Sequence, residues 1–155
     1  MLIYILISLL IVALDQISKV IITTHFSLGE QVSIIKGILS FTYIQNEGAA
    51  FGMLQGARVF FIVLTVVVLI GAAYYIVKMR PRSILEKTAL FFILGGAVGN
   101  FIDRAAFGYV RDFIMTDFMD FPVFNIADCF VCIGAGLYVL FTLLDLFHSK
   151  REEEK

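Results

Sequence analysis

Two aspartates stand out as residues that could do chemistry. Asp112 lies in Val110-Arg111-Asp112-Phe113, and Asp128 closes Phe124-Asn125-Ile126-Ala127-Asp128, so each borders a long apolar run. A carboxylate at or within a bilayer is costly unless it is paired or used, which makes it a functional-site candidate. Two carboxylates in one site cannot both ionise easily, so one can hold a proton while the other activates water. We predict such a pair, although the spacing alone does not bring the two residues together.

The composition is that of a membrane protein. Of the 155 residues, 60% are apolar and 16% are charged, and the mean hydropathy is +0.94. A helix rises about 1.5 Å per residue, so about 20 apolar residues cross a hydrocarbon core of about 30 Å. Four stretches are long enough: 2–22, 59–77, 84–102 and 124–147. We predict one domain over residues 1–155, mainly α-helical and polytopic, with a four-transmembrane-helix bundle.

The first span could be mistaken for a secretory signal. It lacks a basic start and a small-x-small cleavage site, and Asp15 and Lys19 interrupt it. We therefore expect it to be retained as a transmembrane helix, so that the mature chain begins at Met1.

Basic residues predict the orientation of the bundle. They gather in the link between the second and third spans and in the C-terminal tail, as Lys78, Arg80, Arg82, Lys87, Lys150, Arg151 and Lys155. By the positive-inside rule these regions are cytoplasmic. Four crossings then place both termini inside and segments 23–57 and 103–123 outside. The asymmetry is incomplete, because the outer segments also carry Lys36, Arg58, Arg104 and Arg111.

The outer segments have some structure of their own. Residues 40–45 alternate polar and apolar side chains at a strand period, which predicts a small extracytoplasmic β-sheet. The following stretch, 46–52, contains two glycines that permit tight turns and close backbone approach. We expect Asp112 to lie on a loop. Residues 113–121 alternate Phe and Met with acids, which predicts a short outer amphipathic segment at the headgroup level.

Polar residues also interrupt the spans. Asn100, Asp103 and Arg104 follow the small-residue stretch 95–99, and spacings of three and four put them on one helix face. Packing alone does not require such a cluster. Asp15 and Lys19 are four residues apart, so they could form a self-contained ion pair near the outer interface, or they could line the same polar site.

Five stretches together resemble one known family, the lipoprotein signal peptidases, also called prolipoprotein signal peptidase, signal peptidase II or aspartic peptidase family A8. In chain order they are Asp15-Gln16-Ile17-Ser18-Lys19, Asn46-Glu47-Gly48-Ala49-Ala50-Phe51-Gly52, Gly95-Gly96-Ala97-Val98-Gly99-Asn100-Phe101-Ile102-Asp103-Arg104, Val110-Arg111-Asp112-Phe113 and Phe124-Asn125-Ile126-Ala127-Asp128. Five motifs in the family's order and at its spacing, on a four-span chain of its usual length, make a specific signal.

The resemblance implies a membrane-embedded aspartic endopeptidase that removes the signal peptide from diacylglyceryl-modified prolipoproteins, just before the lipidated cysteine. It implies a catalytic pair, Asp112 and Asp128, and no metal or cofactor. The residues that it implies at the substrate are Asp15, Lys19, Asn46, Gly48, Asn100, Asp103, Arg104, Asn125 and Ala127. It further implies a monomer in the bacterial cytoplasmic membrane, contact with membrane lipid, an active site near the extracytoplasmic face and inhibition by globomycin-type cyclic peptides.

One residue departs from the family pattern. Arg111 stands where the family usually has an apolar residue. A cation there could lower the pKa of Asp112 if its side chain turned inward, although neighbours on an extended segment usually point to opposite sides. Cys129 and Cys132 are one helical turn apart within a span, where we expect them to be packing residues.

Other functions are weaker interpretations. A Ser or Cys triad lacks a histidine in reach, because His25 and His148 belong to opposite membrane faces. Asp117 and Asp120 could join Asp128 in a metal site, but no ligand spacing supports one. A proton-coupled transporter would spread its acids across the membrane depth, and a metal-dependent lipid-headgroup transferase would need a dense acidic quartet on the cytoplasmic side. A net charge of −1, without a basic and aromatic surface, predicts no nucleic-acid partner.

Overall fold

In the computed structural model, the described part of the chain comprises residues 1–48, 53–81 and 83–153, with side chains as far as 149. The elements in order are α1 (Leu2–His25), β1 (Gln31–Ile35), β2 (Leu39–Asn46), α2 (Arg58–Met79), α3 (Ile84–Ala106), β3 (Val110–Thr116) and α4 (Ile126–Glu153). Part of the predicted turn motif, residues 49–52, lies outside the described residues. The four predicted spans are confirmed as four helices long and apolar enough to cross a membrane.

All four helices differ somewhat from their predicted bounds, and α1 and α4 show the reasons. α1 runs on to His25 because the hydroxyls of Thr23 and Thr24 donate to carbonyl oxygens one turn earlier, which lets these polar residues stay helical. α4 begins at Ile126, later than predicted, because Phe124 is still paired with Ile114 as an isolated β-bridge. The Asn125 side chain then accepts a hydrogen bond from the backbone N–H of Asp128, as an N-cap residue does.

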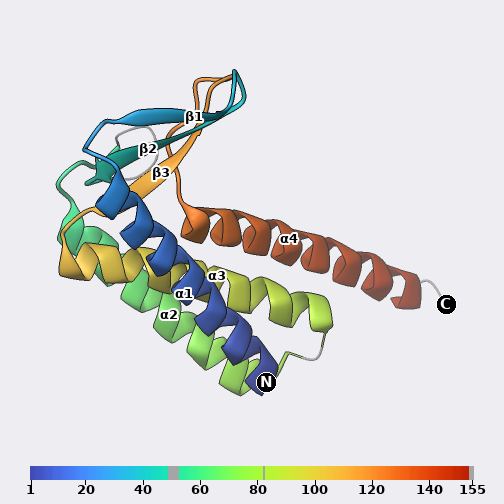
Figure 1. Cartoon of the computed structure of the whole chain (residues 1–155). Coiled ribbons are helices and arrows are strands. Elements are labelled where there is room, and N and C mark those ends of the chain that lie inside the picture. The colour runs from blue at the N-terminus through green and yellow to red at the C-terminus, as the bar shows by residue number, and fades with distance from the viewer. Residues whose placement is uncertain (49–52, 82, 154–155) are drawn as a thin grey trace.

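The bundle is built around α3, which contacts α1, α2 and α4. The sheet sits at one end of the bundle, and the start of α1 and the end of α4 lie away from it (Figure 1). Gly96 and Gly99 make the contact with α4 close, since a Cβ at Gly99 would stand 3.2 Å from that of Ala127. Most large apolar side chains of the helices are exposed in the protein alone, as expected where lipid covers them.

The sheet has three antiparallel strands in the order β1-β2-β3, so the predicted small β-sheet is present, with two strands besides the one that residues 40–45 indicated. The prediction that Asp112 lies on a loop is wrong, because Val110–Thr116 pairs with β2. The reason is packing: Phe113 is buried with Ile22 of α1 and Tyr43 of β2 in a cluster that joins sheet and bundle. The local sequence pattern of this segment was ambiguous, and burial of one of its faces in the tertiary structure makes it a strand.

Candidate active site

The two candidate aspartates come from different elements and meet at one asparagine. Asp112 lies on β3, and Asp128 lies in the first turn of α4. The Nδ2 of Asn125 donates to Asp112 Oδ1 at 2.6 Å, while the Asn125 backbone N–H donates to Asp128 Oδ2 at 3.1 Å. Asn125 is 0% exposed, so these bonds are shielded from water. The structure therefore brings together the pair that spacing alone could not.

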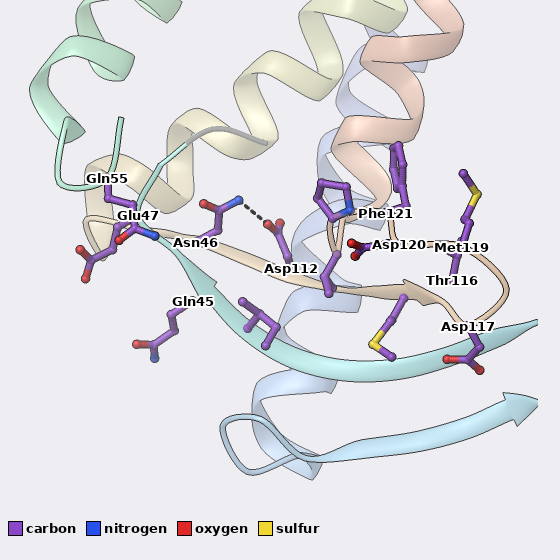
Figure 2. A pocket seen from close by; sticks show the side chains of 14 residues that line it. Gln45, Asn46, Glu47, Gln55, Asp112, Thr116, Asp117, Met119, Asp120 and Phe121 are labelled. Atoms are coloured by element: carbon purple, nitrogen blue, oxygen red, sulfur yellow. Dashed lines mark hydrogen bonds between the residues drawn. The ribbon is translucent and has the colours of Figure 1, made fainter. Parts of the chain in front are cut away.

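Two further amides hold the outer oxygens of the pair. The Nδ2 of Asn46 donates to Asp112 Oδ2 at 2.8 Å, as Figure 2 shows, with Asn46 at the end of β2 reaching across to β3. The Nδ2 of Asn100, on α3, donates to Asp128 Oδ1 at 2.7 Å. Every carboxylate oxygen of the two aspartates thus accepts a hydrogen bond from Asn46, Asn100 or Asn125. Such bonds fix the carboxylates for an incoming reactant.

Burial and charge act against ionisation of Asp112. Its side chain is 2% exposed, and burial, followed by the negative charge of Asp128, raises the pKa of Asp112 to about 7. The amide donors Asn46 and Asn125 and the Lys19 ammonium act in the opposite direction on this pKa. A carboxyl whose pKa lies near neutrality can change its protonation during a reaction at little cost.

Arg104 and Gly48 form the wall nearest the turn after β2. The Arg104 guanidinium donates to the Gly48 carbonyl oxygen at 3.0 Å and lies over the Phe61 ring at 4.6 Å. Gly48 in turn donates its N–H to Asn46 Oδ1 at 3.0 Å, which orients the amide that serves Asp112. A Cβ at Gly48 would stand 3.3 Å from the N of Gln55, so the close turn favours glycine.

Asp15, Lys19 and Asp103 stand one layer behind the pair. All three are 0% exposed. Lys19 Nζ lies 2.8 Å from Asp15 Oδ2, 3.3 Å from Asp103 Oδ2 and 2.9 Å from Asn100 Oδ1. The ion pair and the shared polar site, which the sequence left as alternatives, therefore exist together.

The same layer fixes the start of α4. Asp15 Oδ1 accepts the backbone N–H of Ala127 at 2.9 Å, and Ala127 is 0% exposed. A carboxylate at a helix N-terminus satisfies an unpaired N–H and matches the helix dipole. Because Asp128 is the next residue, this contact positions its carboxylate.

Arg111 points away from the pair. Its guanidinium binds Asp103 and Gln16 and lies over the Phe107 ring, on the opposite side of β3 from Asp112. The possibility that Arg111 lowers the pKa of Asp112 from an inward position is therefore wrong, and the alternation of side chains along a strand is the reason.

Two cavities meet at Asp112. The outer one, of about 950 Å³, lies along the sheet and includes Asp112, Asp117 and Asp120 in its lining. The inner one, of about 590 Å³, reaches from the pair down α4 and is mostly apolar. Asp112 and Asn46 line both, whereas Asp15, Lys19 and Asp103 line neither. Asp128 lines only the inner cavity, so a reactant there would reach both carboxylates, whereas one in the outer cavity would reach Asp112.

Some sequence predictions need correction or addition here. Cys129 and Cys132, predicted to be packing residues, are free thiols that line the inner cavity. Gln16 was missed as a site residue. Its amide donates to Asp15, to Asp103 and to the Gly99 carbonyl oxygen. The available signal was a third polar residue beside Asp15 in an apolar span.

The carboxylate of Asp117 takes part in hydrogen bonds within the sheet region. Asp117 accepts hydrogen bonds from the Ser40 hydroxyl at 2.7 Å and from Gln31, which ties the end of β3 to the other two strands. Over the part of the chain that the structure describes, no group of three or more His, Cys, Asp or Glu residues could hold a metal ion.

Comparison with known proteins identifies the family of this chain. The family described as Signal peptidase (SPase) II matches residues 7–144. The chain belongs to the signal peptidase II family. The lipoprotein signal peptidase of Enterococcus faecalis (strain ATCC 700802 / V583) is 45% identical over 92% of this chain and 89% of that protein. That of Streptococcus pyogenes serotype M2 (strain MGAS10270) is 48% identical over 85% of this chain and 87% of that protein.

Solved structures agree with this family. A bacterial membrane enzyme solved by the in meso method at 2.3 Å resolution superposes with a TM-score of 0.89 at 39% identity, covering 92% of this chain and 88% of that one. A second, at 1.9 Å resolution, gives a TM-score of 0.84 at 39% identity, covering 90% of this chain and 92% of that one. As a signal peptidase II, the chain is an aspartic peptidase with four membrane helices.

Proposed function

We propose that Asp112 and Asp128 are the catalytic pair of this signal peptidase II, which removes signal peptides from prolipoproteins by cutting just before the diacylglyceryl-modified cysteine. Family membership supports the reaction and the prolipoprotein substrate. The observation that carries the catalytic assignment is the Asn125 bridge, which joins the two carboxylates that line the inner cavity.

The reaction needs a water, a base and an acid. One aspartate of the pair, as a carboxylate, accepts a proton while the water oxygen attacks the scissile carbonyl carbon, and the other gives its proton to the carbonyl oxygen. Collapse of the tetrahedral intermediate breaks the C–N bond, and a proton passes from the pair to the leaving nitrogen. The products are a carboxyl end on the signal peptide and a free amine on the cysteine. The shared proton belongs to the pair and is assigned to neither residue.

Besides the two aspartates, the predicted site residues divide into three groups in this proposal. Asn46, Gly48, Asn100 and Arg104 line the inner cavity, so they are positioned to orient the scissile amide. Asn125 bridges the carboxylates from beneath. Asp15, Lys19, Asp103 and Ala127 are completely buried, so we assign them to holding the site together and not to contact with substrate.

The polarity of each cavity indicates which part of the substrate it would hold. The inner cavity, with walls from α4 residues such as Cys132 and Ile133, fits apolar signal-peptide residues and acyl chains. The outer cavity fits the polar chain that follows the cysteine. Each buried methylene contributes about 0.8 kcal/mol, so the acyl chains would supply much of the binding. Globomycin-type cyclic peptides would inhibit by occupying the same space.

The orientation of the protein in the membrane is inferred from its basic residues and from the position of the proposed site. The sheet and the aspartate pair lie at one end of the bundle, and the basic link with Lys78 and Lys87 lies at the other. The positive-inside rule then supports cytoplasmic termini and an active site near the extracytoplasmic face of the bacterial cell membrane. One chain supplies every residue of the proposed site, which supports function as a monomer in contact with membrane lipid.

Asparagine substitutions test the pair. Asp112→Asn and Asp128→Asn each remove one titrating carboxyl, so cleavage of a diacylglyceryl-modified prolipopeptide by the purified protein should fall by roughly a thousandfold or more. Asp145→Asn, on exposed α4 far from the sheet, is the matched control and should cleave at the wild-type rate.

The same assay includes two further arms. The unmodified peptide should be cut much more slowly than the lipidated one, and EDTA should leave the rate unchanged. Near wild-type turnover by either Asp112→Asn or Asp128→Asn would refute the catalytic assignment.

A further inference from the structure

Four buried charged side chains lie together behind the catalytic pair. Asp15, Lys19 and Asp103 are 0% exposed, and Arg111 is 6% exposed. They come from α1, α3 and β3, and their formal charges cancel. Buried charges are tolerated only when each is paired, so removing one leaves its partner uncompensated.

Arg111 holds Asp103 from three directions. The Arg111 guanidinium lies 2.6 Å from Asp103 Oδ1 and 3.2 Å from Oδ2, and the Arg111 backbone N–H donates to Oδ2 at 2.9 Å. A second bond from the guanidinium goes to Gln16 Oε1 at 2.9 Å. This two-pronged contact is the geometry that suits arginine and a carboxylate.

Lys19 is shared between this network and the catalytic pair. Its ammonium contacts Asp15, Asp103 and Asn100 Oδ1, the last at 2.9 Å. An ammonium can only donate hydrogen bonds, so Asn100 must present its oxygen to Lys19 and its amide N–H to Asp128. The direction of the bond from Asn100 to Asp128 is thus set by Lys19.

From these contacts we propose that Arg111 is a positioning residue: by neutralising Asp103 it keeps the charge of Lys19 available to Asn100 and the aspartate pair, and so sets the pH range of hydrolysis. The proposal rests on the assignment of Asp112 and Asp128 as the catalytic pair. Without Arg111, Asp15 and Asp103 would share Lys19, and the layer behind the pair would carry one net negative charge.

The charges around the pair come from every neighbouring element. They are Asp15 and Lys19 on α1, Glu47 after β2, Arg58 at the start of α2, Asp103 and Arg104 on α3, Arg111 on β3, and Asp117 and Asp120 after it. Among them Lys19 has a route of hydrogen bonds to both aspartates, through Asn100 and Asn125. Arg104 lines the inner cavity directly, so its effect is separate from that of Arg111.

The test is a charge cycle on Arg111 and Asp103 in the full-length protein. Removing a unit charge roughly 10 Å from a carboxyl, at an effective dielectric constant of about 20, changes its pKa by about one unit. Arg111→Met adds one net negative charge to the layer, so the pH profile of kcat/KM should move up by about one unit. Asp103→Asn adds one net positive charge and should move it down. The double variant restores neutrality and should return the profile toward that of the wild type.

Conservative and structural controls accompany the cycle. Arg111→Lys keeps the charge and should keep the wild-type profile, with a lower Tm because the two-pronged contact is lost. The substrate is the diacylglyceryl-modified prolipopeptide in detergent micelles, from pH 5 to pH 10. A purely structural role for Arg111 predicts lower Tm in the single variants with no opposite shifts in pH.

Each outcome decides the proposal. Shifts in the same direction, or no shift in either single variant, would overturn it even if Asp112→Asn is inactive. If Arg111→Met does not fold, Asp103→Asn must still shift the profile down while Arg111→Lys leaves it unchanged, or the proposal fails. Activity in Asp112→Asn would instead remove the catalytic assignment, which makes the two failures distinguishable.

Discussion

At the residue scale, Asp112 is held between opposing influences. Burial and the charge of Asp128 favour its protonated form, while the amide donors Asn46 and Asn125 favour the carboxylate. Its pKa of about 7 is the balance of these effects. An acid–base group is most useful when its pKa lies near the working pH, so the amides and the second aspartate together tune the pair for neutral conditions.

This balance predicts a pH-dependent stability. The pKa of Asp112 is raised in the folded protein from its usual 3.8 to about 7. The associated stabilisation is fully present below about pH 4 and is lost as the pH rises through about 7, by an amount on the order of 4 kcal/mol. The Tm in detergent should therefore fall between pH 5 and pH 8. In Asp112→Asn this fall should be clearly smaller; an equal fall would show that Asp112 does not titrate in this range.

Some residues of the proposed site could be predicted from the sequence, and others could not. Asp112 and Asp128 were singled out from the cost of a carboxylate near lipid, a property that each residue carries by itself, and their catalytic role stays a prediction. The shared role of Lys19 and the contacts of Gln16 could not be found in this way, because they depend on which helix faces meet. The direction of the Arg111 side chain could be inferred from the alternation of side chains along a strand, but only once residues 110–116 were known to form a strand.

At the element scale, α3 is the helix that the other three contact, and it supplies Asn100 and Arg104 to the proposed site. Its small residues let α4 approach closely enough for Asn100 to reach Asp128. The four spans were predictable from apolar length. The third strand was not, because Val110–Thr116 becomes a strand through pairing with β2 and burial of Phe113, contacts between segments about 70 residues apart.

The close contact between α3 and α4 predicts an asymmetric response to alanine. In Gly96→Ala the new Cβ would press on the Ala127 carbonyl oxygen and stand 2.7 Å from Val131 Cγ2. This should cost about 1–3 kcal/mol, more than the gain of about 1 kcal/mol in helix propensity, so Tm falls. Because Asp128 follows Ala127, kcat should fall as well.

Gly71→Ala is the matched control on α2. No atom lies within 4 Å of a Cβ built at Gly71, so helix propensity acts alone and Tm should rise slightly with kcat unchanged. Equal responses of the two glycines, measured by thermal unfolding and by cleavage rate, would contradict a tight contact at Gly96.

At the scale of the whole molecule, the apolar helix surface that would face lipid and the buried charged side chains lie in different parts of the structure. α2 buries none of its residues and is held by few polar contacts, such as the bond from the Tyr75 hydroxyl to Glu86 at 2.6 Å. The charges at the sheet end are mostly engaged: Arg111 with Asp103, and Arg58 with the carbonyl oxygens that end α3. Arg58 and Arg111, two of the basic residues that weaken the charge asymmetry of the sequence, are thus engaged in bonds within the protein.

This arrangement makes the orientation testable by labelling. With Cys129 and Cys132 replaced by alanine and activity verified, a single cysteine is placed at Ser27, beyond α1 near the sheet, or at Ser149, near the end of α4; both sites are exposed. The positive-inside rule predicts that Ser27→Cys reacts with an impermeant thiol reagent added to intact cells. Ser149→Cys, and Ser83→Cys in the basic link, should react only after the membrane is opened. The reverse pattern would put the aspartate pair on the cytoplasmic side, where a prolipoprotein that has crossed the membrane could not reach it.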